Sequence, residues 1–297
     1  MSPGEVGIAV AISTRNRPEA LERCLASLWS GERRPDQIVI VDQSADDLTA
    51  VVVQTRRGAG VPILYAPQRT RGLGASQNLA FQHARHEIVA VIDDDCVADA
   101  KWLALIATEL GRRSDLDAIT GRVLPLPAEG DRSFAVSSRT SAVRREFAGA
   151  ALPWEVGSGN NFAVRRDAFL RAGGCDERLG PGSPAQGGVD MDLFYRLVRS
   201  GSRILYEPRV VVYHERQTRY ERKARRPMYG HGMGAAIALW HRRGDGSAAT
   251  VLAAWARLRL RQMRLAAVRR DWSDVRDEMT TLASTVSGLI HGWKLDR

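Results

Sequence analysis

The sequence predicts an α/β fold in which a mostly parallel central sheet is flanked by helices and followed by a helical, basic C-terminal appendage. Three observations lead to this prediction. Short apolar runs alternate with helical patterns through the first hundred residues, which is typical of a parallel sheet covered on both faces. The order of elements becomes mixed after about residue 117. From Arg216 onward the pattern is helical and rich in alanine and arginine.

Within the first hundred residues, each apolar run has the length of a buried strand and is followed by a helical pattern. We expect strands at residues 7–13, 37–41, 63–65 and 87–92. We expect helices from Pro18 onward and near 47–56, 75–85 and 99–112. Pro18 suits the first turn of a helix, because a backbone N–H at that position would have no partner within the helix.

The middle of the chain is less regular. We expect strands at residues 118–123, 161–164 and 203–213, the last interrupted at Pro208, and a loop at 124–141. Gly187 and Gly188 precede an amphipathic helical pattern. This mixture of elements indicates that the sheet does not continue as a simple series of parallel strands.

Composition limits the class of protein. The chain has 297 residues, of which 44% are apolar and 26% charged, as in a globular protein with a sizeable core. Collagen-like, disordered and disulfide-scaffold classes are excluded. The three cysteines, Cys24, Cys96 and Cys175, form no C-x-x-C motif and favour a reducing compartment. We expect no signal peptide and no membrane span, hence a cytoplasmic protein that contacts a membrane only peripherally, at its inner face.

The net charge of +9 is concentrated at one end. Residues 215–297 hold 17 Lys and Arg against 8 Asp and Glu, which accounts for the whole excess. A nucleic-acid-binding surface would not be distributed in this way, so we expect no nucleic-acid partner. We divide the chain into a catalytic domain, 1–215, and a helical, arginine-rich region, 216–297.

Arginines of this second region alternate with apolar side chains such as Leu252, Trp255 and Leu258. Two interpretations are open. The helix could lie on an anionic membrane surface. Alternatively, the region could be a helical cap or a homodimer contact whose arginines are solvated.

Three consecutive carboxylates, Asp93, Asp94 and Asp95, follow the predicted strand at 87–92. Ligands of parallel sheets bind at the carboxyl ends of strands. Three anions in one small volume repel one another, so a cation is the natural counter-charge, and oxygen ligands suit Mg²⁺ or Mn²⁺. The alternative is a solvated acidic turn that caps a helix starting near Asp99.

The segment before that strand combines Arg69 and Arg71 with a glycine-containing turn into a helix. A helix N-terminus flanked by arginines can hold a phosphate. The segment matches neither the G-x-G-x-x-G dinucleotide fingerprint nor the G-x-x-x-x-G-K phosphate loop.

Farther along the chain, Asp190 and Asp192 open the helix that follows Gly188. Residues two apart do not share a helix face, so the two carboxylates should have different roles. Asp192 has Arg196 four residues on, a structural pair, whereas Asp190 is a helix cap or a general base. His214 ends the last predicted strand on the same face as Val212.

Taken together and in this order, these segments resemble family 2 glycosyltransferases, whose fold is the Rossmann-like GT-A fold. The resemblance covers roughly residues 6–215. The matching segments are residues 11–17, 41–44, 71–78, 93–95, 157–162, 173–176 and 190–193, with Arg196 and His214. Two positions depart from the family pattern: Val189 stands where a glutamate is usual, and the second strand carries one aspartate, Asp42, where many members have two.

The resemblance implies roles for individual residues. The nucleotide-binding residues would be Ser13, Thr14, Arg15, Asp42, Arg71, Asp93 and Asp94. The metal ligands would be Asp95 and His214, with Asp93 as a further candidate. The general base would be Asp190. The sugar and acceptor region would include Gly159, Asn160, Asn161 and Asp192.

The implied activity is an inverting, metal-dependent glycosyl transfer from a nucleoside-diphosphate sugar, with UDP or dTDP favoured, to an acceptor hydroxyl that is lipid-linked or on a small natural product. Two alternatives stay open. A sugar nucleotidyltransferase would carry a G-x-G-x-R loop after the first strand, where this chain has Ser13, Thr14 and Arg15. A non-catalytic membrane- or nucleic-acid-binding module on a degenerate GT-A fold would leave the aspartates without a role.

Overall fold

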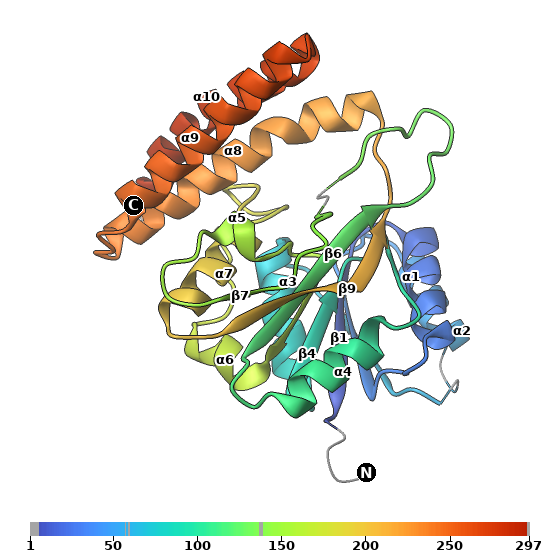
Figure 1. Cartoon of the computed structure of the whole chain (residues 1–297). Helices are drawn as coiled ribbons and strands as arrows, with labels where there is room; N and C mark the ends of the chain where they lie inside the picture. The colour runs from blue at the N-terminus through green and yellow to red at the C-terminus, as the bar shows by residue number, and fades with distance from the viewer. Residues whose placement is uncertain (1–5, 57, 59, 137–138, 296–297) are drawn as a thin grey trace.

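The computed structural model describes residues 6–56, 58, 60–136 and 139–295. One sheet forms the centre of the molecule (Figure 1). Its strands, in spatial order, are β3 (Ile63–Pro67), β2 (Gln37–Asp42), β1 (Ile8–Thr14), β4 (Ile88–Ile92), β8 (Asn161–Arg165), β6 (Ala118–Pro125), β9 (Ile204–His214) and β5 (Cys96–Ala98), with β7 (Arg145–Phe147) paired to β9. The first four are parallel, and β8 is antiparallel to both neighbours. The predicted change from parallel to mixed order is confirmed.

Helices cover both faces of this sheet. They are α1 (Pro18–Ser30), α2 (Leu48–Arg56), α3 (Leu73–His83), α4 (Trp102–Arg112), α5 (Pro153–Val156), α6 (Arg166–Arg171) and α7 (Val189–Arg199). Alternation along β1 divides the core in two. Val10 and Ile12 pack with α1 and α4 on one face, whereas Ala9 and Ala11 pack on the face covered by α3 and α7. The expected α/β layering is therefore present.

The sequence analysis expected the last strand to be interrupted at Pro208, but β9 is continuous. The register against β6 shifts instead: Gly121 pairs with Glu207, and the next residue of β6 pairs with Val211. Pro208 lies in the resulting bulge, where its missing N–H removes no ladder hydrogen bond. A Cβ at Gly121 would lie 1.9 Å from the Val210 carbonyl oxygen, so only glycine fits opposite the bulge.

Four short elements, β5, β7, α5 and α6, were not predicted. Each has between three and six residues, and periodicity over so few positions carries little information. One of them adjoins a predicted site residue, because β5 pairs antiparallel with the end of β9 and brings Cys96 directly opposite His214.

The C-terminal region forms three long helices, α8 (Arg219–Arg242), α9 (Ala248–Val268) and α10 (Trp272–Gly292), which lie along one side of the α/β body (Figure 1). Helices α8 and α10 approach closely because glycines face each other's backbone. A Cβ at Gly234 would lie 2.1 Å from the Thr285 carbonyl oxygen, and one at Gly288 would lie 1.9 Å from that of His231. None of the helices in the described part of the chain has both the length and the apolar character that a bilayer span requires.

Helix α8 also packs directly on α7. A Cβ at Gly232 would lie 2.2 Å from the carbonyl carbon of Gly187, so the backbone of α8 touches that of the turn before α7. Farther along α8, Trp240 stacks on Tyr195 of α7 with ring centroids 3.8 Å apart. The division of the chain near residue 215 stays a prediction, and these contacts make α8 one wall of the α/β body.

Candidate active site

Polar side chains gather where the parallel strands end. Thr14 at the end of β1 is paired with Asp42 at the end of β2, and Asp93 to Asp95 follow β4, the other neighbour of β1. The Thr14 hydroxyl donates to Asp94 across this edge, with 2.7 Å between the oxygens. The edge selected from the sequence therefore exists as a spatial cluster.

The acidic cluster is not a solvated turn. Asp94 is only 4% exposed, and α4 begins at Trp102 without a side-chain cap. Burial, with Asp95 beside it, raises the pKa of Asp94 to about 6. Burial raises the pKa of Asp93 well above its usual range, with Asp95 and Asp94 adding to the effect. Carboxylates held at this cost in electrostatic energy are typical of a functional site.

Arg17, at the start of α1, is a member of the cluster that the sequence analysis did not select. One guanidinium nitrogen, Nη1, donates to Asp94 Oδ1 at 3.1 Å and to Asp95 Oδ2 at 2.7 Å. The guanidinium supplies part of the counter-charge that we had assigned wholly to a metal. The signal was present, since Arg17 closes the first matching segment, but only the fold brings it to residues 77 and 78 positions away.

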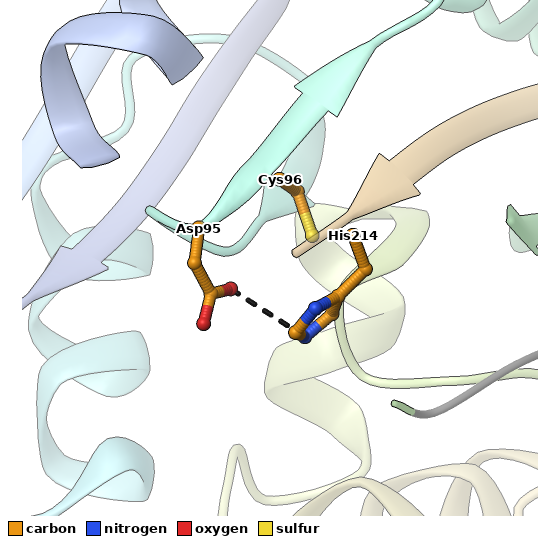
Figure 2. Close-up of side chains that lie close together, drawn as sticks. All are labelled: Asp95, Cys96 and His214. Atoms are coloured by element: carbon orange, nitrogen blue, oxygen red, sulfur yellow. Dashed lines mark ion pairs between the residues drawn. The ribbon is translucent and has the colours of Figure 1, made fainter. Parts of the chain in front are cut away.

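Asp95 and His214 form a pair of donors suited to a metal ion. In Figure 2 the Asp95 carboxylate and the His214 ring face each other, with the Cys96 thiol beside them. His214 Nδ1 lies 2.7 Å from the Glu215 carbonyl oxygen, which can only accept, so we assign the ring proton to Nδ1. Nε2 then presents a lone pair to Asp95 Oδ1, 3.5 Å away.

The surroundings of this pair fit a cation. Asp95 Oδ1 is buried and has no hydrogen-bond partner among the residues that the structure describes. Burial lowers the pKa of His214, which favours the neutral, ligating form of the ring. A carboxylate oxygen and a neutral imidazole nitrogen that face each other without a proton between them form an incomplete metal site.

The end of the edge where the sequence predicts nucleotide-binding residues is held together by side chains from β2, β3 and the loop after β2. Asp42 accepts from the Tyr65 hydroxyl at 2.7 Å and from the Ser44 backbone at 2.9 Å. Gln43, which the sequence analysis did not select, donates to the carbonyls of Thr70 and Gly72 and accepts from the Gly72 N–H. These bonds position the arginine-flanked turn before α3.

Other predicted nucleotide-binding residues lie on the same edge. Ser13 accepts from the Ser76 hydroxyl of α3 at 2.7 Å, which ties β1 to that helix. Arg15 and Arg71 are exposed at the ends of the loops that flank the edge. Both arginines are therefore accessible to a ligand from solvent.

Asp190 lies at the start of α7. Gly188 adopts a left-handed conformation (φ 84°) at the helix N-terminus, and the Gly159 N–H donates to Asp190 Oδ2 at 3.1 Å. A Cβ at Gly159 would lie 2.8 Å from the Asp190 side chain, so glycine is required there. Burial raises the pKa of Asp190, although backbone donors oppose the shift.

Asp192 has a different role from Asp190, as its position two residues on predicted. Its carboxylate is completely buried, and Oδ2 accepts from Arg196 Nε at 2.9 Å, which confirms the structural pair. Oδ1 accepts from the Trp240 indole of α8 at 2.8 Å. Asp192 therefore links α7 to α8, and both oxygens of its buried carboxylate already accept hydrogen bonds.

The two asparagines of the predicted acceptor region also differ. Asn161 is fully buried; its side chain accepts from the Trp102 indole and donates to two carbonyls of the β6–β9 bulge. Asn160 is 3% exposed, and neither polar atom of its side chain has a partner within the described residues. Because Ile92 pairs with Asn161, Asn160 lies across from Asp93. Asn160 is therefore the one available to a ligand.

This arrangement can be compared with known proteins. Residues 9–170 match the model of the family described as glycosyl transferase family 2. The chain belongs to this family. A pre-mycofactocin glycosyltransferase of Mycobacterium tuberculosis is 28% identical over 253 residues, which is 80% of this chain and 49% of that protein. The chain thus spans about half the length of this curated relative.

A second curated relative of this family 2 member is the glucosyl-dolichyl phosphate glucuronosyltransferase of Haloferax volcanii, 22% identical over 71% of this chain and 69% of that protein. Among solved structures, a mannosyltransferase of Pyrobaculum calidifontis in complex with GDP-Man and Mn²⁺ matches 98% of this chain and 88% of its own, with a TM-score of 0.66 at 18% identity. Staphylococcus aureus TarS with UDP-GlcNAc matches 95% and 92%, with a TM-score of 0.60 at 15% identity. At these identities the structures establish the GT-A fold.

Proposed function

We propose that the protein is an inverting glycosyltransferase that moves a sugar from a nucleoside-diphosphate sugar to an acceptor hydroxyl, with a divalent metal at Asp95 and His214 and with Asp190 as general base. The observation that carries this proposal is the buried Asp95 Oδ1, which has no hydrogen-bond partner within the described residues and faces His214 Nε2 in a family 2 chain. A buried oxygen without a hydrogen-bond partner does not stabilise the fold, which favours a role in binding a ligand.

The donor would lie along the edge formed by β1, β2 and β4, against the predicted nucleotide-binding residues. Asp42, beside Tyr65, would contact the base of the nucleotide. We propose that this nucleotide is UDP or dTDP. Mg²⁺ or Mn²⁺ would be held by Asp95 and His214, with Asp93 as a further candidate ligand; the mannosyltransferase with a similar fold is described with Mn²⁺. When bound, the ion would supply positive charge to the departing diphosphate.

The reaction requires a base because an acceptor hydroxyl is a weak nucleophile near neutral pH. Asp190 would take the hydroxyl proton as the acceptor oxygen bonds to the anomeric carbon. The bond from that carbon to the diphosphate oxygen breaks in the same step, and displacement from the opposite side inverts the configuration. The raised pKa of Asp190 brings its basicity closer to that needed at neutral pH.

For the acceptor region we retain Gly159 and Asn160. Gly159 orients the base through its backbone N–H, and Asn160 has free donor and acceptor capacity in the described structure. We propose either a lipid-linked acceptor or a small natural product. The curated relatives give precedent for two acceptors, since one is named for glucosyl-dolichyl phosphate and the other for pre-mycofactocin.

Thermal stabilisation by nucleoside diphosphates tests the donor site. UDP, dTDP, GDP, ADP and CDP would each be added with and without Mn²⁺. We expect a selective shift in the melting temperature that requires the metal and is lost in Asp95→Ala, since ligands that bind the folded state raise its apparent stability. No shift with any of the five nucleotides would reject the donor site.

A sugar nucleotidyltransferase is disfavoured by the family match and by the absence of a G-x-G-x-R loop at residues 13–17. A non-catalytic module would leave the buried acidic cluster unexplained. We further propose that the protein acts in the cytoplasm and contacts the inner face of a membrane peripherally through its C-terminal region.

A further inference from the structure

The outward face of α10 carries a stripe of exposed apolar side chains, in which the cation Arg276 lies between the first two. Its side chains are between 47% and 69% exposed: Trp272, Met279, Val286, Ile290 and Trp293. The spacings of seven, seven, four and three residues return to one side of a helix. From the first tryptophan to the last the stripe is about 32 Å long, at 1.5 Å per residue. Single exposed apolar residues need no explanation, but five on one side of a helix over this length do.

The bundle does not itself need this stripe. Helix α10 packs on α8 with its opposite face, through Gly288 and Gly292. It contacts α9 through Thr285, which accepts a hydrogen bond from the Trp255 indole at 3.0 Å. The stripe is therefore left over after the internal packing of the three helices.

Several side chains that the sequence suggested for a membrane contact are used inside the protein. Trp255 is 7% exposed, and Leu252 and Leu258 pack against the core of the body. Arg222 pairs with Asp274 and Asp277, and Arg259 pairs with Glu278 at 3.2 Å. The face of α9 that appeared amphipathic in the sequence points inward.

The side of α9 opposite Leu258 is also exposed. Leu260 is two residues from the inward-facing Leu258 and so lies on the other side of the helix, where it is exposed. Arg257 and Arg264, three residues before and four residues after Leu260, share that side and are exposed. The outward side of α9 is thus both basic and apolar.

Charge decides what could cover this surface. Within residues 248–295, the exposed charged side chains are one anion, Asp271, and seven cations, Arg257, Arg261, Arg264, Arg269, Arg270, Arg276 and Lys294. A second copy of the chain would bring these cations against the same cations. An anionic lipid surface complements them, and the two tryptophans that bound the stripe suit the boundary between headgroups and acyl chains.

We propose that α10 lies in the plane of an anionic phospholipid bilayer, with the Trp272–Trp293 stripe inserted among the headgroups and the arginines of α9 against the lipid phosphates. This inference deepens the peripheral membrane contact proposed above by assigning it a face. The long helix axis would then be parallel to the bilayer, as for other interfacial amphipathic helices.

Co-sedimentation of the full chain with vesicles tests the proposal. Vesicles of phosphatidylcholine alone would be compared with vesicles that also contain phosphatidylglycerol, without nucleotide present. We expect binding to the anionic vesicles that weakens with added salt. The double variant Val286→Asp/Ile290→Asp should lower the affinity at least about tenfold, and Arg264→Ala roughly fivefold.

Matched controls distinguish binding through this surface from non-specific binding of exposed apolar side chains to vesicles. Val143→Asp and Leu170→Asp change exposed apolar side chains of the body and should bind like the wild type. Equal binding by the α10 double variant would overturn the proposal. The proposal would also be overturned if light scattering showed that the wild type is a dimer and the double variant a monomer, while the wild type did not bind vesicles. Vesicle binding is measured without nucleotide, so its result is independent of the donor-site test. Either test can fail while the other succeeds.

Discussion

The acidic edge of the sheet and the C-terminal bundle use charge in opposite ways. At the edge, Arg17 pairs with only two of three consecutive carboxylates, and a buried oxygen of Asp95 has no hydrogen-bond partner in the described structure. In the bundle, Arg222 and Arg226 of α8 reach across to carboxylates of α10. The bundle is thus close to electrostatic balance inside, whereas the edge is left with an excess of negative charge.

The difference distinguishes binding from packing. Unmatched groups at the edge keep an interaction available for a ligand, at the cost of stability in the empty protein. Paired groups and glycine contacts in the bundle hold three helices and the α7 helix together. Trp240 connects the two regions, because its indole donates to Asp192, two residues from the candidate base.

Removing the candidate base should give the largest effect. In Asp190→Asn the amide oxygen can still accept from the Gly159 N–H, so the local geometry is preserved. We expect kcat to fall by roughly 10²–10⁴-fold, the range for loss of a general base, while donor binding measured by calorimetry is unchanged. A variant that turns over at nearly the wild-type rate would reject Asp190 as the base.

Introducing a side chain between α8 and α10 should strongly destabilise the fold. In Gly288→Ala the new Cβ would lie 1.9 Å from the His231 carbonyl oxygen, and both backbones must move apart. We expect a loss of about 3 kcal/mol in the free energy of unfolding, measured in urea. Gly246→Ala is the control, since no atom of the described residues lies within 4 Å of its Cβ and its change should stay within about 0.5 kcal/mol. Comparable losses in both variants would contradict close packing between these helices.

Loss of the hydrogen bond between α8 and α7 should lower the free energy of unfolding more than loss of a similar bond inside the bundle. Trp240→Phe keeps an aromatic ring against Tyr195 but leaves an oxygen of the buried Asp192 without its indole donor, at a cost of about 2 kcal/mol. Trp255→Phe removes an indole bond to the neutral Thr285 hydroxyl and should cost about 1 kcal/mol. Urea unfolding of both variants measures this difference. If Trp255→Phe lowers the free energy of unfolding more than Trp240→Phe does, the bond between α8 and α7 is not the stronger of the two.

The pH dependence of turnover should report the environment of Asp190. A base must be deprotonated, so activity is lost as the pH falls through the pKa of the base. Burial raises that pKa, and the acidic limb of the kcat profile should therefore lie above the value of about 3.9 for an exposed aspartate. Profiles of the wild type and of Asp190→Asn would be compared. A limb retained unchanged by the variant would belong to another group.

Much of the candidate site was predictable because it follows local patterns. The apolar run of β4 predicts a buried strand, and the three aspartates after it must then emerge at a strand end. A local pattern could not show which of Asn160 and Asn161 is available to a ligand. Only the β6–β9 bulge, which engages the Asn161 side chain, leaves Asn160 as the available group.

The sequence alone determined the order of the main helices and strands, the acidic edge and the excess of positive charge in the last third of the chain, because periodicity and composition act over neighbouring residues. The tertiary structure decided which of those charges are neutralised. Arg17 reaches Asp94 and Asp95, Arg259 reaches Glu278, and Trp255 turns inward while the α10 stripe stays exposed. Pairing and burial depend on contacts between segments far apart in the chain, which no local pattern encodes.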